Sequence, residues 1–138
     1  MISQLLLATL MVIITVLMHG SGIAALARIL RFDPNTAEAH HHFSLRHALM
    51  ILAIVLALFT LHGVEIWLYA GLYLLLGAAA DLETAVYFST ITYAGIGFDD
   101  ADMARRWRLV SAIEGVNGIL LLGWSTAFFV TVVARLRR

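Results

Sequence analysis

One short stretch of the sequence combines backbone freedom with negative charge. A β-branched run ends at Thr92, glycines follow at residues 95 and 97, and two aspartates close the stretch. It lies between two segments apolar enough to cross a bilayer, where irregular backbone is tolerated only inside protein or along a cavity. Backbone carbonyls there can replace an ion's hydration shell, and carboxylates attract cations. The candidate ion-binding residues are Gly95, Ile96, Gly97, Phe98, Asp99 and Asp100.

A second set of ionisable residues lies inside the apolar segments. His62 and Glu65 are three residues apart and therefore share one face of a helix, and Glu114 lies in the last apolar segment. Imidazole and carboxylate groups are metal ligands. Together with Asp99, these residues are candidates for a divalent-metal site. His19 stands alone in the first apolar segment, where we expect it to pack against its neighbours rather than bind a ligand.

Three consecutive histidines, His40 to His42, lie in a polar connector with Glu38 nearby. On a helix, Glu38, His41 and His42 would share a face, and that donor set suits zinc or nickel. Three adjacent histidines cannot all face one metal from one regular element. A solvated turn at the membrane interface is therefore the favoured interpretation of this segment, and its role stays open.

The composition excludes several classes of protein. The 138 residues are 62% hydrophobic and 13% charged, with a mean hydropathy of +0.91, whereas soluble domains are about 45–50% apolar and about 25% charged. The chain is therefore an integral membrane protein. Zero net charge gives no support to a nucleic-acid partner, and the absence of cysteine excludes disulfides and thiol chemistry. No nucleophile constellation supports an enzyme, and no cofactor is expected besides bound or permeant cations.

The apolar pattern predicts three transmembrane helices and one shorter helix. A crossing needs about 20 apolar residues, which the ranges 2–30, 45–80 and 109–136 supply. Residues 81–94 would form a helix of about 18 Å, too short to cross. Asp81 is the expected N-cap of that helix, and Glu83 lies in its positive first turn.

Aromatic residues near the end of the second apolar segment resemble an interfacial belt. Trp67, Tyr69 and Tyr73 are amphipathic side chains of the kind that lie at headgroup level. This interpretation places the nearby Glu65 at a shallow depth.

The loop resembles a known family. Tyr87-Phe88-Ser89-Thr90-Ile91-Thr92, followed by Gly-x-Gly-aromatic-x-Asp, is similar to the pore loop of the two-helix potassium channels, which reads Ser-x-x-Thr and then Thr-Val/Leu-Gly-Tyr-Gly-Asp. The chain keeps Gly97, the aromatic Phe98 and the closing Asp100. It departs at Gly95, which replaces a threonine, and at Asp99, which replaces a glycine. The resemblance covers roughly residues 45–138 and leaves the first helix outside it.

The resemblance implies a domain plan. Residues 1–44 form an N-terminal transmembrane helix and a cytoplasmic histidine-containing connector, and residues 45–138 form the pore domain. The parts of the pore domain are the outer helix 45–80, the re-entrant pore helix 81–94, the filter 95–100 and the inner helix 105–136. Four chains would surround one axis as a homotetramer embedded in lipid. Gly115 or Gly118 would be the gating hinge of the inner helix, although small-residue helix packing explains both glycines equally well.

The function predicted from these features is a cation channel with relaxed potassium selectivity. The alternatives are a divalent-metal transporter on the same scaffold and a non-conducting regulatory subunit. The candidate cations are potassium, sodium, calcium, magnesium and manganese. An outside N-terminus and a cytoplasmic C-terminus in the cell membrane place six of the nine arginines on the cytoplasmic side, as the positive-inside rule requires.

Overall fold

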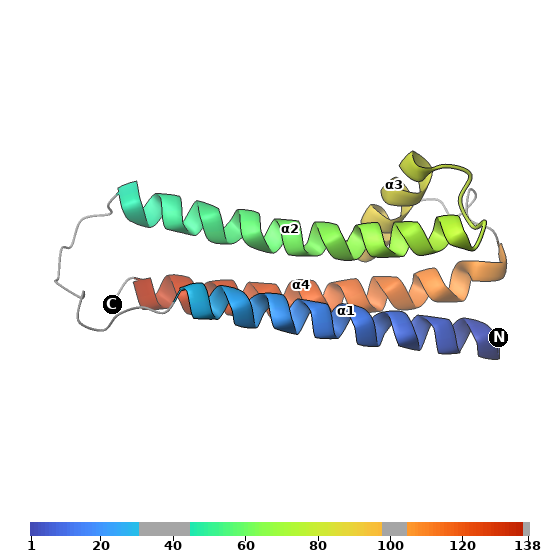
Figure 1. The fold of residues 1–138 in the computed structure, drawn as a ribbon, viewed down its shortest axis with the longest axis horizontal. Helices are drawn as coiled ribbons and strands as arrows, with labels where there is room; N and C mark the ends of the chain where they lie inside the picture. Colours follow the sequence, from blue (N-terminus) through green and yellow to red (C-terminus); the bar gives the residue numbers. More distant parts are fainter. Residues whose placement is uncertain (31–44, 98–104, 137–138) are drawn as a thin grey trace.

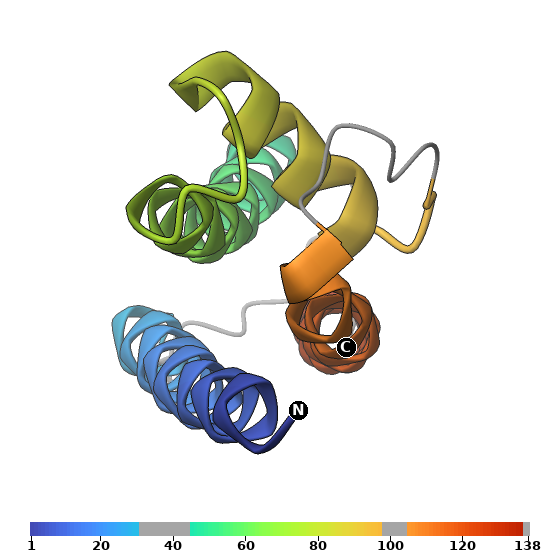
Figure 2. The same cartoon turned by 90° about the vertical axis from the view of Figure 1, so that its right-hand side faces the viewer.

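The computed structural model describes residues 1–30, 45–97 and 105–136, and they are almost entirely helical. The elements in chain order are α1 (Ile2–Ile29), α2 (Leu45–Leu75), α3 (Leu82–Tyr93), η2 (Arg105–Trp107) and α4 (Arg108–Leu136). Figure 1 shows the three long helices side by side along the long axis, with α3 at the end where the N-terminus lies. Viewed from that end, α3 lies across α2 and α4 on the side opposite α1 (Figure 2). The predicted all-helical architecture is confirmed.

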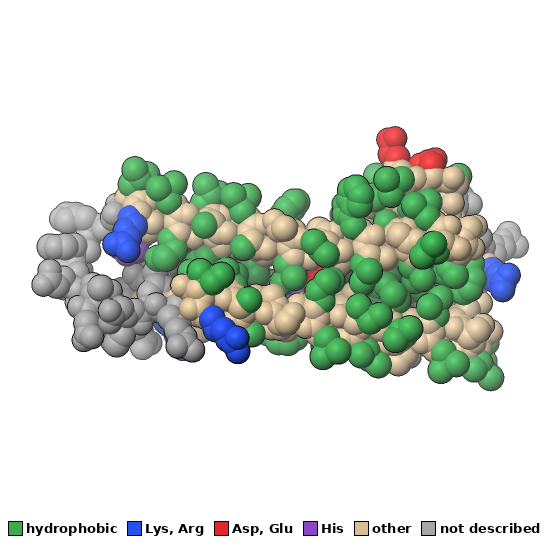
Figure 3. Space-filling view, in the orientation of Figure 1, with side chains coloured by type: hydrophobic (Ala, Val, Ile, Leu, Met, Phe, Trp, Pro, Cys, Tyr) green, Lys and Arg blue, Asp and Glu red, His purple; other side chains and the backbone are tan. Residues whose placement is uncertain are grey.

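The helices α1, α2 and α4 are each long and apolar enough to cross a membrane, as predicted from the sequence. On the face shown in Figure 3, hydrophobic side chains are spread along the length of the bundle, and the basic side chains lie toward its two ends. Exposing such a surface to water is unfavourable, whereas lipid tails solvate it without cost.

The helix α1 runs without a break through the segment His19-Gly20-Ser21-Gly22. A Cβ atom at Gly20 would lie 3.1 Å from the Trp124 ring of α4, and one at Gly22 would lie 2.8 Å from the Leu61 side chain of α2. The two glycines therefore allow α1 to approach both neighbouring helices closely, as small residues do in membrane bundles.

The helix α2 ends at Leu75, earlier than the predicted limit at residue 80. Gly77 has φ 60°, and its N–H donates to the Leu74 carbonyl at 3.0 Å, while the Ala78 N–H donates to the Tyr73 carbonyl at 2.8 Å. These two bonds define a Schellman end, in which glycine supplies the left-handed residue just beyond the helix. Because α2 ends here, the chain can reverse direction before α3 begins at Leu82.

The short helix α3 begins at the predicted cap. Asp81 is extended, and its carboxylate accepts a 2.8 Å hydrogen bond from the Thr84 N–H. This bond lowers the pKa of the Asp81 carboxyl because it stabilises the charged form. Glu83 lies in the first turn, where the helix dipole favours negative charge.

Two apolar clusters hold the bundle together at opposite ends. One cluster joins α1 near Ala8 to Tyr69 and Tyr73 of α2 and to the buried face of α3. The other joins Ile23 of α1 to the first half of α2 and to Val132 near the end of α4. Polar side chains are also buried in the bundle, between these clusters and beside the first of them. The buried polar residues of the described ranges are Thr15, His19, Glu65, Ser89, Ser111, Glu114, Asn117 and Ser125.

Candidate functional site

The end of α3 leads directly into the candidate ion-binding loop. Gly95 has φ 71° and Gly97 has φ 60°, both in the left-handed region that glycine adopts readily. The Gly95 N–H donates to the Thr92 carbonyl at 3.0 Å, and the Ile96 N–H donates to the Ile91 carbonyl at 2.9 Å. This is a second Schellman end, so Gly95 terminates the helix as well as beginning the loop.

The position of α3 gives the loop a favourable electrostatic environment for cations. The twelve-residue helix points its C-terminal, negative end toward the glycine segment. Of the candidate ion-binding residues, the structure describes Gly95, Ile96 and Gly97. Phe98, Asp99 and Asp100 lie outside the described residues, and their assigned roles stay predictions.

The helix α4 passes very close to the last turn of α3. A Cβ atom at Gly118 would lie 2.2 Å from the Tyr93 carbonyl oxygen, and one at Gly115 would lie 3.2 Å from the Thr92 carbonyl oxygen. These two glycines therefore create the space in which the end of α3 rests on α4. Their additional role as a gating hinge stays a prediction.

A buried polar cluster lies directly behind this end of α3. His19 Nδ1 is 2.9 Å from Glu65 Oε1, and His62 Nδ1 is 2.9 Å from the Tyr93 hydroxyl oxygen and 3.3 Å from Glu65 Oε2. The Tyr93 hydroxyl donates to Glu65. Ser125 Oγ lies 3.0 Å from His62 Nε2 and 3.2 Å from His19 Nε2. We call these five residues the His–Glu cluster; they join all four α-helices.

The second buried carboxylate belongs to a separate cluster. Tyr73 and Ser89 both donate hydroxyl hydrogen bonds to Glu114, which is fully buried. Through these bonds Glu114 of α4 holds α2 and the middle of α3 together. We call these three residues the Glu114 cluster.

One further polar contact links α4 to the first helix. The amide nitrogen of Asn117 lies 2.8 Å from Thr15 Oγ1 and 3.3 Å from the Tyr69 hydroxyl oxygen. Interhelical hydrogen bonds in membranes contribute about 0.6 kcal/mol on average and rarely more than about 2 kcal/mol. The polar contacts therefore set the register of the helices more than they set the total stability.

The structure brings two of the four predicted metal ligands together, but not the other two. His62 and Glu65 meet, as their spacing predicts, whereas Glu114 is committed to the Glu114 cluster and Asp99 lies outside the described residues. Sequence reasoning missed His19 as a partner of this pair. Its position as an isolated ionisable residue in an apolar span was the available signal, since such residues are retained at functional sites.

The expected aromatic belt is wrong for two of its three members. Tyr69 and Tyr73 are 0% exposed and lie inside the bundle, whereas Trp67 is 58% exposed. Each buried hydroxyl has a polar partner on α4, which compensates its removal from water. Glu65 is also 0% exposed rather than shallow.

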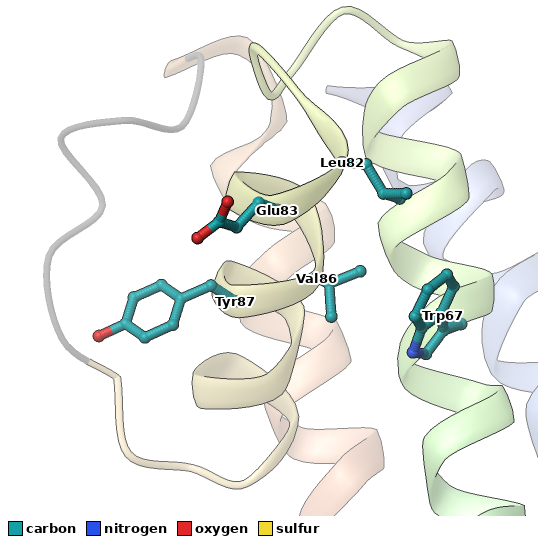
Figure 4. Close-up of a pocket in the computed structure, with 5 residues that line it drawn as sticks. All are labelled: Trp67, Leu82, Glu83, Val86 and Tyr87. Atoms are coloured by element: carbon teal, nitrogen blue, oxygen red, sulfur yellow. The ribbon is translucent and has the colours of Figure 1, made fainter.

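An open groove lies on the outer face between α2 and α3. Figure 4 shows Leu82 and Val86 on the side of α3 that faces Trp67, whereas Glu83 and Tyr87 point away from α2. Glu83 is the only carboxylate or imidazole among these five lining residues. The groove therefore lacks the several ligands that an ion site needs, and the candidate site stays at the glycine segment.

The comparisons with known proteins agree with this geometry. A family model described as an ion channel matches residues 48–135, which is more than half of the chain and includes α3, the glycine segment and α4. The chain is a member of this ion-channel family, and the predicted relation to the two-helix potassium channels is confirmed. The comparisons with curated proteins and with solved structures found no significant match.

Proposed function

We propose that the chain is the subunit of a cation-conducting channel of the cell membrane. The observation that carries the proposal is the half-length helix α3 ending in two left-handed glycines, held against α2 and α4 in a chain of the ion-channel family. The carbonyl oxygens of Gly95, Ile96, Gly97 and Phe98 would bind dehydrated cations, as carbonyl rings do in selectivity filters. No covalent chemistry and no cofactor enter this activity.

The conducting unit is a homotetramer. One chain supplies one loop, and a single loop cannot surround an ion, whereas four loops around an axis can. The re-entrant position of α3 would then bring each glycine segment to the axis. The outer apolar faces that remain would contact lipid.

The filter differs from that of potassium channels in ways that favour relaxed selectivity. Gly95 carries no hydroxyl group, and it closes α3 with φ 71°, a conformation that strains a β-branched threonine. Phe98 lacks the hydroxyl of the usual tyrosine. Asp99 would add a carboxylate ring at the mouth, and such rings attract cations without distinguishing potassium from sodium by size.

The arrangement of the helices supports one orientation. Figure 1 places the N-terminus and α3 at one end of the bundle and the C-terminal end of α4 at the other. With the pore loop outside, the N-terminus is extracellular and the C-terminus cytoplasmic. The arginines of the cytoplasmic side are then Arg28, Arg31, Arg46, Arg135, Arg137 and Arg138, in agreement with the positive-inside rule.

Ion flux through purified protein in liposomes tests the proposal. We expect sodium and potassium to pass at comparable rates, and Asp99→Gly to raise the potassium-to-sodium permeability ratio because it removes the carboxylate ring. Asp102→Asn is the control, since it also removes a negative charge near the mouth. Strong potassium preference in the unmodified protein would contradict the relaxed filter. Absence of any cation flux would favour the regulatory subunit, and native mass spectrometry showing a monomer or dimer would exclude the tetramer.

A divalent-metal transporter is the second candidate, and the carboxylate at residue 99 favours it. Four carboxylates gathered near an axis repel one another unless a cation lies among them, and a divalent ion relieves this repulsion more than potassium does. Asp99→Asn should therefore weaken manganese and calcium uptake or block at fixed ionic strength, while Asp102→Asn should leave both unchanged. Unaltered divalent binding in Asp99→Asn would remove the main support for a transporter.

A further inference from the structure

The His–Glu cluster holds a carboxylate in the middle of the bundle. Glu65 and His19 are both 0% exposed, and His62 is 12% exposed. An unpaired ionised carboxylate at this depth is strongly unfavourable, so it needs a compensating positive charge. The described residues packed around Glu65 provide imidazole and hydroxyl groups as its partners.

The His–Glu cluster has fewer N–H and O–H hydrogen atoms than it has contacts of hydrogen-bond length. Two neutral imidazoles carry one N–H each, and the Ser125 and Tyr93 hydroxyls carry one O–H each. These four protons face five close contacts, four between nitrogen and oxygen atoms and one between two oxygen atoms. At least one contact would then join two lone pairs, so one additional cation, a proton or a metal ion, would stabilise the cluster.

One choice of tautomer for the two imidazole rings would place that cation beside Glu65. The Nε2 atoms of His19 and His62 both contact Ser125 Oγ, at 3.2 and 3.0 Å. A hydroxyl oxygen has two lone pairs and can accept both N–H groups. In this tautomer, with hydrogen on both Nε2 atoms, both Nδ1 atoms present lone pairs toward the Glu65 carboxylate.

We propose that His19, His62 and Glu65 form a binding site for a divalent transition-metal ion, namely zinc. Their ligand atoms all lie within 4.8 Å of one another, whereas the ligand atoms of a tetrahedral zinc site are about 3.4 Å apart at zinc–ligand distances of about 2.0–2.2 Å. Small side-chain adjustments therefore suffice to enclose the ion. Tyr93 Oη, 2.9 Å from His62 Nδ1, is a further oxygen atom beside this set.

The contacts around the site resemble those that support zinc ligands in proteins. A metal-bound histidine usually donates its other ring N–H to a neighbouring group, which fixes the ring and its tautomer. Ser125 supplies that group for both histidines. The donor set of two imidazole nitrogens and one carboxylate oxygen is one that zinc commonly uses.

A zinc ion here would be a resident ion rather than a permeant one. It would join α1 to α2 and, through Tyr93, to the last residue of α3 before the glycine segment. Because Tyr93 lies just before the glycine segment, binding of the ion would restrain the position at which the candidate filter begins. The site does not depend on whether the loop conducts ions, so metal binding and flux can succeed or fail separately.

Metal content of the purified full chain tests the site. The variant His40→Gln/His41→Gln/His42→Gln serves as the background, because those three residues could bind zinc adventitiously. After treatment with a chelator, incubation with zinc and desalting, we expect about one zinc ion per chain by mass spectrometry of the metal. Glu65→Gln and His62→Gln in this background should lose nearly all of it. His47→Gln, which removes another histidine of α2, should retain it.

X-ray absorption at the zinc edge identifies the ligands without a cluster variant. We expect four nitrogen or oxygen neighbours at about 2.0–2.1 Å, with imidazole scattering from two rings. Ser125→Ala should weaken zinc affinity by about 10–100-fold, because both histidines lose their supporting partner. If the background protein retains no zinc, or if its zinc shows no imidazole neighbours, the proposal is wrong and a shared proton supplies the positive charge. Full zinc retention by a folded Glu65→Gln protein would overturn it equally.

Discussion

Gly118→Ala should destabilise the protein more than any other glycine-to-alanine change in the described helices. The added Cβ atom would lie 2.2 Å from the carbonyl oxygen of Tyr93 and 2.8 Å from its carbonyl carbon, both of them backbone atoms. The clash cannot be relieved by a side-chain rotation, so α4 or the end of α3 must move. Overpacking of this kind costs about 1–3 kcal/mol, and here it also displaces the start of the candidate filter.

Two other glycines of α4 provide matched controls. A Cβ atom at Gly123 meets nothing within 4 Å, and one at Gly115 lies 3.2 Å from the Thr92 carbonyl oxygen. Gly123→Ala should therefore raise stability by up to about 1 kcal/mol through helix propensity, while Gly115→Ala should have an intermediate effect. Thermal unfolding of the three variants in detergent, followed by circular dichroism, gives the ranking.

The same experiment separates packing from a hinge. If Gly118 only provides flexibility, alanine should stiffen α4, and Gly118→Ala should be as stable as Gly123→Ala. Equal melting temperatures for these two variants would therefore contradict the close approach of α3 and α4. A large loss of stability at Gly118 alone would show that packing explains this glycine.

Glu114→Ala should be the second strongly destabilising change. It removes the acceptor of the buried Tyr73 hydroxyl, and an unsatisfied buried donor costs about 1–3 kcal/mol. Ser89 also loses its bond to Glu114 but keeps the Ile66 carbonyl as an acceptor at 3.0 Å. It also leaves a cavity in the core near α3. We expect a lowered melting temperature and faster proteolysis in the turn before α3, because α3 loses its hydrogen bond to α4.

Two further variants identify the cause of that loss. Glu114→Gln keeps one acceptor oxygen and similar volume, so it should be milder than Glu114→Ala. Adding Tyr73→Phe to Glu114→Ala should cost less than the sum of the two single changes, because the unsatisfied donor disappears together with its acceptor. Strict additivity of the two changes would mean that the Tyr73–Glu114 bond contributes nothing.

The short helix α3 could be predicted because its signals are local. Asp81 caps α3 through a residue three positions away, as predicted. The glycines that end α2 and α3 are local signals too, but the predicted range 45–80 runs past Gly77, and the predicted filter uses Gly95 only as an ion-binding residue. Such signals are contained in a few neighbouring residues, and the family match covers the same region.

The His–Glu cluster could be predicted only in part because its contacts are long-range. His62 and Glu65 are neighbours on one helix, but His19 is 46 positions from Glu65 and 106 from Ser125. No periodicity in α1 specifies which partner its histidine meets. The prediction for Tyr69 and Tyr73 was wrong for a related reason. An aromatic residue near a helix end suits the membrane interface and the protein core equally well. Only the rotation of α2 about its own axis decides which of the two the residue faces.

The contacts with α1 divide α4 into two parts. One part is held by hydrogen bonds, and the other is held by apolar contacts alone. Asn117 and Ser125 are both joined to α1 by directional bonds, so the segment between them, which includes Gly118, can tilt only by carrying α1 with it. Beyond Ser125, Val132 meets α1 and α2 through apolar contacts, which have no preferred direction and allow neighbouring surfaces to slip. The helix α1 therefore restrains the movement of α4 up to Ser125. Only the last three turns of α4, at the end of the bundle away from α3, can move independently of α1.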